Sequence, residues 1–596
     1  MMEHARCQQR KQHARNVRRR VCRARAEQRV RVPAAQEDTL RPASKGDLPP
    51  TSQLVRIPQK NYYAQDDWRV AVKQLTPLDE FAYQCRVEGT LPKELDGTLF
   101  RNGPGRYERG GAKYAHFLDG DGLIVSFDLQ PSEQTAFARA KFVRTAEYVE
   151  ESREEKVLYR GTFGTRKDGI STFDLRTKNL ANTNVMFHAG KLHALYEAGV
   201  PYKLDPHTLD TLGKDSLNGV LQRTEGLFVT LQNDLLNQSV GLGAWAFTAH
   251  PHIDSHTGHM VGWAWQSCAG SSISVQFAQI DEEGNPVVLQ PYLLENCMAA
   301  PHDFGVTKQH YVMIQNRLDL QIAPYVLGMK SAANALVSRP DLPVLVHVIP
   351  REGATSDCEK SIVLEGPRES FEIHVCFAHD GAPIDCEQPD DADDHQSLVT
   401  IYTAGWDKLA PGSFLSEWGA EGDVAPDFNR IPRTVLWRYV VDTNTGSVTR
   451  TLAPGCEGIC IDHPHATPRF EGHRSCRYVW STVTNEVSTS GPPRGYVRLD
   501  LLTGERETWY APSGRLFVEE PVIVEKDSAK GNECDMGEVW LLGMCTDVED
   551  DGRSSLLILD GARLADGPVC RVRLEHHVTH GLHGCFASGF HSTASD

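Results

Sequence analysis

The chain has 596 residues, 40% of them hydrophobic, and a formal net charge of −17 at pH 7. A negatively charged body argues against nucleic acid as the main partner, because phosphate backbones are bound by clustered Lys and Arg. No run approaches about 18 consecutive apolar residues, so no transmembrane helix is expected, and the 15 scattered Cys lack the paired CxxC spacing of thiolate zinc sites.

The N-terminal segment has the opposite charge to the rest. Residues 1–31 carry ten Arg and one Lys against two Glu, a net +9, which leaves −26 for the remainder. The segment lacks the apolar stretch of a secretory signal peptide. Its Arg richness fits a transit peptide, although it contains no serine, and a disordered basic tail fits equally well. We expect residues 1–60 to be a disordered basic arm and linker, and residues 61–596 to be one folded domain.

Seven copies of a strand–turn–strand unit follow along the folded part. Each has alternating apolar residues on both sides of a turn, as in YKLDPHTLDTLG around Asp205. This alternation around turn residues is typical of β-hairpins. The units are centred on Asp128, Asp205, Asp281, Pro350, Asp442, Asp500 and Asp560. The repeat predicts an all-β, seven-bladed β-propeller, and the alternative is a large β-sandwich with ordinary hairpins.

Leu320–Val337 is an apolar stretch with a single Lys, LQIAPYVLGMKSAANALV. Such a stretch is consistent with an interfacial helix whose apolar face enters lipid without spanning the bilayer. A helix packed on the propeller explains the same composition. Both interpretations remain open from the residues alone.

Four histidines stand in four separate strand-like segments: His250, His302, His374 and His583. Imidazole suits iron, copper, zinc and nickel, and four neutral ligands leave a metal ion its full charge. Ligands spread this widely need a closed, radial fold to bring them together. His252 lies two residues after His250 and would share a strand face with it, so spacing alone does not separate these two.

Several motifs, in order along the chain, carry a resemblance to a known family. They are GTLFRNGPGRYE (Gly97–Glu108), LDGDGL (Leu118–Leu123), KFVRTAEYVEE (Lys141–Glu151), LYRGTFGT (Leu158–Thr165), NLANTNV (Asn179–Val185) and YEAGVPYKLDP (Tyr196–Pro206). From about Trp68 to Phe586 the chain resembles the carotenoid cleavage oxygenases, most of all the cyanobacterial apocarotenoid oxygenases. The resemblance implies a seven-bladed propeller with Fe(II) on its axis and a loop and helix cap over the active site. It also implies O2-dependent cleavage of a conjugated double bond in a carotenoid or apocarotenoid, giving two carbonyl products, retinal-type ones included.

The resemblance implies the four iron ligands residue by residue. His250 matches the histidine of the AHP motif, and the family usually has a basic residue where His252 stands, so we choose His250. His302 in HDFGVT and His583 in GLHG match closely. His374 stands in HVCFAHD, where the family reads His-x-x-Asn-Ala-aromatic-Glu, so its surroundings depart from the pattern.

The resemblance also implies three carboxylates that hold the second ring nitrogens of these histidines. Glu197 in YEAG and Glu520 in EEPVIV match directly, whereas Asp462 in DHPHATPRF replaces a glutamate that usually precedes Phe and Pro. An aspartate is one methylene shorter, so either the backbone moves inward or a water bridges. Thr183 in NTNV matches a residue near the open iron position in relatives. Six other histidines are expected to be surface or satisfied residues rather than ligands: His379, His463, His465, His576, His577 and His580.

The implied partners are a hydrophobic polyene, O2 as cosubstrate, and a membrane surface met by Leu320–Val337, which in relatives belongs to an apolar patch around a tunnel mouth. No nucleic acid and no obligate protein partner are expected. The implied location is cytoplasmic or plastid, with peripheral membrane association. Runner-up functions of the same fold are a stilbene-cleaving oxygenase and a retinoid isomerase. From a different class, a non-catalytic propeller scaffold would not need four histidines with carboxylate partners.

Overall fold

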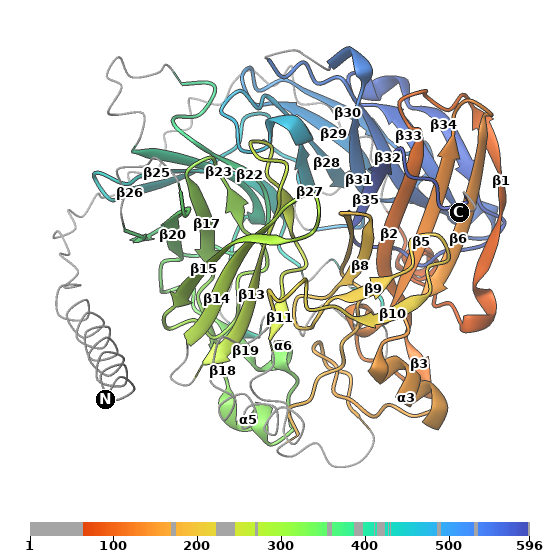
Figure 1. The fold of residues 1–596 in the computed structure, drawn as a ribbon, viewed down its shortest axis with the longest axis horizontal. Coiled ribbons are helices and arrows are strands. Elements are labelled where there is room, and N and C mark those ends of the chain that lie inside the picture. The colour runs from red at the N-terminus through yellow and green to blue at the C-terminus, as the bar shows by residue number, and fades with distance from the viewer. Residues whose placement is uncertain are drawn as a thin grey trace, which may run out of the picture. The chain divides into compact units, whose positions relative to one another are not determined.

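The computed structural model describes residues 63–167, 174–221, 245–268, 272–353, 360–386, 397–409, 412–413, 424–426, 428, 431–484, 490–529 and 534–593. The expected arm, residues 1–60, lies outside these residues. Within them the chain is mostly antiparallel β-sheet (Figure 1). The α-helices there are short: α2 (Gln65–Ala71), α3 (Ala146–Glu154), α5 (Ile322–Val326) and α6 (Ala332–Ala335).

Five separate sheets in this part of the chain have four or five strands each. The first two consist of β7 (Asn184–His188), β8 (Lys191–Leu195), β9 (Tyr202–Leu204) and β10 (Thr211–Lys214), and of β11 (Ala246–Phe247), β12 (His252–Ile253), β13 (Met260–Cys268), β14 (Ser272–Ile280) and β15 (Pro286–Leu294). The third consists of β16 (Gly305–Val306), β17 (His310–Gln315), β20 (Leu345–Pro350) and β21 (Ile362–Glu365). The last two consist of β22 (Glu372–Asp380), β23 (Leu398–Trp406), β25 (Thr434–Asp442) and β26 (Ser447–Leu452), and of β27 (Cys460–Ala466), β28 (Tyr478–Thr484), β29 (Gly495–Asp500) and β30 (Arg506–Tyr510).

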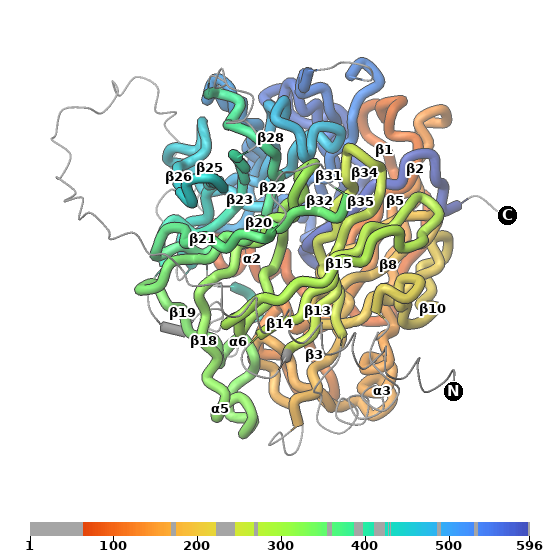
Figure 2. Tube along the Cα trace, turned by 60° about the vertical axis from the view of Figure 1, so that its left-hand side comes forward, coloured from red at the N-terminus to blue at the C-terminus, as the bar shows by residue number. Residues whose placement is uncertain are grey.

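A nine-stranded sheet joins the beginning and the end of the folded part, in the order β31-β32-β33-β34-β1-β6-β5-β2-β35. Its strands are β1 (Phe81–Gly89), β2 (Gly97–Arg106), β5 (Asp121–Gln130), β6 (Thr135–Phe142), β31 (Leu516–Glu525), β32 (Val539–Asp547), β33 (Arg553–Asp560), β34 (Pro568–Arg573) and β35 (Gly584–Ser588). β1 pairs with β34, and both views show this orange-to-blue junction (Figures 1 and 2). Two small sheets consist of β18 (Leu318–Leu320), β19 (Leu336–Ser338) and β24 (Gly412–Ser413), and of β3 (Glu108–Arg109) and β4 (Ala112–Lys113).

All seven predicted hairpins are antiparallel strand pairs in the structure. They are β5–β6, β9–β10, β14–β15, β20–β21, β25–β26, β29–β30 and β33–β34. The recurring Asp has a local cause. In the β25–β26 turn, Oδ1 of Asp442 accepts from the backbone N–H of Asn444 at 2.9 Å and of Thr445 at 3.1 Å. An Asp side chain that bonds its own backbone two residues on favours a tight turn.

Neighbouring sheets pack face to face, and their first strands meet around a common centre. The stacked rings of Phe277 in β14 and Tyr311 in β17, with centroids 4.2 Å apart, join two sheets, and burying one such ring contributes roughly 1.5–3 kcal/mol. Among the first strands, β22 contacts β16 and β27, β31 contacts β27 and β35, and β35 contacts β7. The expectation of an all-β, propeller-like fold is therefore confirmed.

Leu320–Val337 is not one helix, so that part of its interpretation is wrong. α5 ends before Gly328, which has a φ of +72° and donates its N–H to the Tyr325 carbonyl at 3.1 Å. α6 starts after Ser331, whose hydroxyl accepts from the Asn334 N–H at 3.3 Å. A glycine in the left-handed conformation ends a helix readily. In the part of the chain that the structure describes, no helix is long and apolar enough to cross a membrane.

Candidate metal centre

The four histidines expected as ligands meet at the inner ends of the sheets. His250 lies between β11 and β12, His302 just before β16, His374 within β22 and His583 just before β35. One ring nitrogen of each lies within 4.8 Å of those of the other three. The Nε2 atoms of His250 and His302 are 2.9 Å apart. The structure thus gathers into one cluster four side chains that are spread over more than three hundred positions of sequence.

Three of these rings have a carboxylate on the nitrogen that points away from the cluster. The pairs are His302 Nδ1 with Glu197 Oε2 at 2.5 Å, His374 Nδ1 with Asp462 Oδ1 at 2.9 Å, and His583 Nδ1 with Glu520 Oε1 at 2.8 Å. Because Nδ1–H donates to the carboxylate, the lone pair of Nε2 is free to face the centre. Asp462 contacts its histidine directly, although its side chain is one methylene shorter than that of glutamate.

β-Bulges in three strands direct the neighbouring side chains toward the cluster. The pairing of β22 with β23 changes register on both sides of His374, and β27 changes register against β28 between Asp462 and His465. β31 does the same at Glu519–Glu520. A bulge adds one residue to one strand, bends it and turns its side chains out of strict alternation. Bulges on three inner strands therefore bring carboxylates and histidines to one point.

Burial and charge set the protonation of the cluster. Burial and the neighbouring histidines hold the pKa of His250 well below its ordinary value. Burial also lowers the pKa of His583, although Glu520 acts in the opposite direction. Burial alone would raise the pKa of Glu520, but the nearby histidines hold it well below its ordinary value. For His302 burial is outweighed by Glu197, which raises its pKa. Burial thus favours neutral imidazoles at His250 and His583, while the histidines around Glu520 favour its ionised carboxylate.

This donor set fits a divalent first-row metal ion. Two histidine nitrogens bound to one ion at about 2.0–2.1 Å and at a right angle lie about 2.9 Å apart, which matches the separation of Nε2 in His250 and His302. Two lone pairs so close repel each other unless a cation or a proton lies between them. Imidazole ligands with carboxylates on the outer nitrogens are a common way to hold such an ion.

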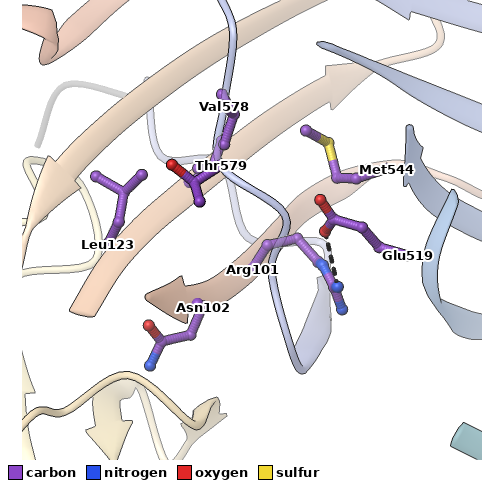
Figure 3. Close-up of a pocket in the computed structure, with 10 residues that line it drawn as sticks. Arg101, Asn102, Leu123, Glu519, Met544, Val578 and Thr579 are labelled. Atoms are coloured by element: carbon purple, nitrogen blue, oxygen red, sulfur yellow. Dashed lines mark hydrogen bonds and ion pairs between the residues drawn. The ribbon is translucent and has the colours of Figure 1, made fainter. Parts of the chain in front are cut away.

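Arg101 in β2 binds a carboxylate of the site, and the sequence did not predict this contact. Its guanidinium donates to Glu520 Oε2 at 2.9 Å and to Glu519 Oε2 at 3.0 Å; the second contact is drawn in Figure 3. Oε1 of Glu520 bonds His583 at 2.8 Å and also His465 at 2.9 Å. Arg101 therefore fixes the carboxylate that orients a predicted ligand. The motif FRNGPG contains Arg101, but in the sequence this motif indicated only the family and not a role for the arginine.

A cavity of about 530 Å³ borders the cluster. Its wall includes His302, His374 and His583 and many apolar side chains, among them Phe117, Phe163, Trp265, Phe371, Ile373 and Leu582. Thr183 is buried in the same wall, and its hydroxyl donates to Asn182 Oδ1 at 3.3 Å. A position for Thr183 near an open iron site stays a prediction.

His252 turns away from the cluster, although it stands two residues from His250. Its Nδ1 bonds the carboxylate of Glu471, and its Nε2 lies 3.3 Å from Asp303 Oδ1. These two carboxylates raise the pKa of His252 to about 10 against the effect of burial, which lowers it. The irregular pairing around β12 separates the two side chains, and only His250 joins the other three.

Three of the six histidines that were not expected as ligands lie next to the cluster, although none of them is one of its four rings. His463 and His580 line the cavity, and His465 bonds Glu520. The bulge in β27 explains the positions of His463 and His465, because it breaks the alternation on which strand faces are assigned. The others bond elsewhere: His379 to the Asp380 carbonyl, His576 to Tyr83 and His577 to the Gly552 and Lys73 carbonyls.

Fold and site together define a propeller-like protein with a four-histidine, carboxylate-supported metal centre beside an apolar cavity. Residues 74–588 match the family model described as retinal pigment epithelial membrane protein. The chain belongs to this family, the carotenoid cleavage oxygenases, and the resemblance of its motifs is confirmed.

Curated relatives whose names refer to different substrates are 29% and 25% identical to the chain in sequence. The chain is 29% identical over 548 residues to the apocarotenoid-15,15'-oxygenase of Synechocystis sp., covering 90% of this chain and 99% of that protein. It is 25% identical over 517 residues to lignostilbene-alpha,beta-dioxygenase isozyme III of Sphingomonas paucimobilis, covering 84% and 93%. The crystal structure of cobalt-substituted Synechocystis ACO has a TM-score of 0.74 at 28% identity and covers 89% of this chain and 100% of that one.

Replacing Asp462 with Ala should lower iron affinity or kcat/KM by roughly 10–100-fold, the usual effect of losing a carboxylate that orients a metal-binding histidine. Asp462→Glu should be tolerated, because the same oxygen can reach His374 Nδ1. Iron titration and steady-state cleavage rates check both. The exposed Asp341→Ala serves as control, and an Asp462→Ala protein that matches it would remove Asp462 from the site.

Proposed function

We propose that the chain is an Fe(II)-dependent dioxygenase that cleaves a conjugated double bond of a carotenoid or apocarotenoid to aldehyde or ketone products, retinal-type products included. The observation that carries this proposal is the cluster of four histidines, of which His302, His374 and His583 are backed by carboxylates and lie in the wall of a largely apolar cavity. Apolar pockets with a few polar groups at one point are typical binding sites for apolar substrates. Family membership supports the assignment as an oxidoreductase.

His250, His302, His374 and His583 would hold the iron, and the bound ion would supply a place for O2 and the electrons for its activation. The residues of the chain bind and orient the polyene beside this point and keep bulk water out. The carboxylates hold the protons on the Nδ1 atoms, which keeps each Nε2 available. No side chain is required to act as a general acid or base.

Seven blades are the count that we propose for the propeller. The nine-stranded sheet can be divided into β31–β34 and the series β2, β5, β6 and β1, which meet where β1 pairs with β34. Together with the five separate sheets this makes seven sets of strands, each containing one of the seven predicted hairpins. The iron would then lie near the common axis. We also propose that residues 1–60 are an arm outside this domain.

The test is cleavage by purified protein loaded with Fe(II) in air. An apocarotenal and a full-length carotenoid should each be offered, with O2 uptake and the mass of the carbonyl products measured. One O2 consumed per polyene cleaved is the expected result. An iron-loaded protein that cleaves neither polyene, but does cleave a phenolic stilbene, would favour the stilbene-cleaving alternative. Isomerisation of a retinoid without O2 uptake would favour the isomerase, and no reaction at all would favour the scaffold.

We further propose that Leu320–Val337 meets the membrane surface from which the substrate comes. Three side chains on or near α5 are exposed: Ile322 at 56%, Leu327 at 45% and Met329 at 64%. The same segment contributes Leu320 and Tyr325 to the cavity wall. A lipid-facing surface next to the cavity would let an apolar substrate pass without crossing water.

Replacing Ile322 and Met329 with Glu should weaken association with liposomes by more than about tenfold, because each apolar side chain that enters lipid contributes roughly 1.5–3 kcal/mol. Cleavage of a liposome-dissolved carotenoid should fall with it, while iron content stays normal. The control carries Glu at Leu212 and Val287, which are exposed at 59% and 49% elsewhere on the surface. Equal liposome binding by the two double variants would contradict the proposal.

A further inference from the structure

His463 has an unusual backbone for a strand residue. It lies in β27 with a φ of +52°, within the bulge that separates Asp462 from His465. In a regular strand the side chains of consecutive residues point to opposite faces. Here Asp462 bonds His374, and its neighbour His463 lies in the cavity wall close to the same ring. The left-handed conformation therefore brings two consecutive side chains to the cluster.

The imidazole of His463 lies beside the predicted metal centre and is not one of the four clustered rings. Its centroid is 5.1 Å from that of His374 and 5.4 Å from that of His583. A neutral imidazole ring offers one hydrogen-bond donor and one acceptor. Nδ1 is buried and has no hydrogen-bond partner among the residues that the structure describes, whereas the residue as a whole is only half-buried, so another edge of the ring faces the cavity.

Both features cost free energy. A left-handed backbone is unfavourable for a residue other than glycine, and a buried polar atom without a partner loses its bonds to water. Residues that keep such costs cluster at functional sites. The same part of the wall carries the polar side chains of Cys460, Thr482 and Thr484 from β27 and β28. A substrate made only of hydrocarbon would leave the His463 ring without a polar partner in the cavity.

We propose that His463 forms a hydrogen bond with an oxygen atom of the substrate and thereby selects oxygenated substrates over hydrocarbons of the same shape. The inference rests on the proposed function and narrows its substrate class. A hydroxyl or carbonyl group provides this chemistry, either as the phenol of a stilbene-type alkene or as the oxygen of an apocarotenoid.

Ligand binding without turnover tests the role of His463. Trp265 is in the cavity wall, so quenching of tryptophan fluorescence under anaerobic conditions reports binding. Two matched pairs of ligands are used: 4-hydroxystilbene with stilbene, and an apocarotenal with the hydrocarbon that lacks its oxygen. In one pair the wild-type chain should bind the oxygenated member about tenfold more tightly, as one hydrogen bond predicts. The pair that shows the preference identifies the source of the oxygen.

His463→Phe should abolish that preference by weakening the oxygenated ligand about tenfold and leaving its hydrocarbon unchanged. His463→Gly removes the ring without backbone strain and should give the same result if the phenylalanine variant does not fold. His463→Asn tolerates the left-handed conformation and keeps a donor and an acceptor, so it should retain part of the preference. His576→Phe replaces an imidazole that is outside the cavity wall and serves as control.

Two results would overturn the inference while leaving the proposed function intact. One is that wild-type protein binds and cleaves both members of each pair equally well. The other is that the Phe and Gly variants change the affinity for both members of a pair by the same factor, or for neither. Binding of no ligand by the wild-type chain, with no cleavage by its iron-loaded form, would overturn the proposed function and this inference together.

Discussion

Replacing His583 with Ala should remove both iron and cleavage activity from the protein. The wild-type chain should contain about one iron, and loss of one of four ligands opens the site and weakens metal affinity steeply. The substitution also takes from Glu520 the Nδ1–H that it accepts at 2.8 Å in the buried interior. Metal analysis of the purified protein and O2 uptake with an apocarotenal measure the two losses. His250→Ala and His302→Ala should behave in the same way.

His252→Ala is the matched control, because His252 stands in the same segment as His250 but bonds Glu471 and Asp303. It should keep its iron. If His252→Ala lost the metal and His250→Ala kept it, the assignment of the ligand in this segment would be wrong.

Arg101→Met should destabilise the protein by roughly 3–5 kcal/mol, the usual cost of leaving buried charges without their partner. Total stabilities are about 5–15 kcal/mol, so much of the protein's stability would be lost. The side chains of Arg101, Glu519 and Glu520 are only 2–4% exposed, and one guanidinium bridges both carboxylates. Iron affinity should fall as well, because Glu520 would no longer be held against His583. Urea unfolding measures the loss of stability, and iron titration measures the loss of iron affinity.

A surface arginine with the same arrangement isolates the effect of burial. Arg339 bridges Asp319 and Asp341 at 2.7 and 2.8 Å, but all three side chains are exposed. Arg339→Met should change stability by about 0–1 kcal/mol. Adding Glu519→Gln to Arg101→Met removes one unpaired charge and should recover part of the loss. Equal destabilisation by the two single arginine substitutions would show that Arg101 does not act through a buried ion pair.

Local patterns account for what could be predicted. The seven hairpins follow from alternating apolar residues and, in cases such as Asp442, from a side chain that bonds its own turn. The four clustered histidines were found because short motifs around them are similar to those of a family. Their convergence depends on that similarity, since no local rule connects His250 with His583.

What could not be predicted depends on bulges and long-range contacts. The extra residue in β27 brings Asp462 directly to His374 and turns His463 inward, whereas alternation along a regular strand separates such neighbours. Arg101 reaches Glu520 across more than four hundred residues of sequence. The break in Leu320–Val337 did have a local cause in Gly328, but its apolar composition suggested one continuous helix.

The pairing of β35 with β2 sets the time at which the metal centre can first exist in a growing chain. Three of the clustered histidines have been synthesised once His374 has been added, but His583 follows only 209 residues later. At about 5–20 residues per second this interval is on the order of tens of seconds. During this interval the nascent protein has an incomplete metal centre, and β2 has not yet paired with β35. The complete four-histidine centre can therefore form only after His583 has been made, when ring closure and ligand assembly occur as one event.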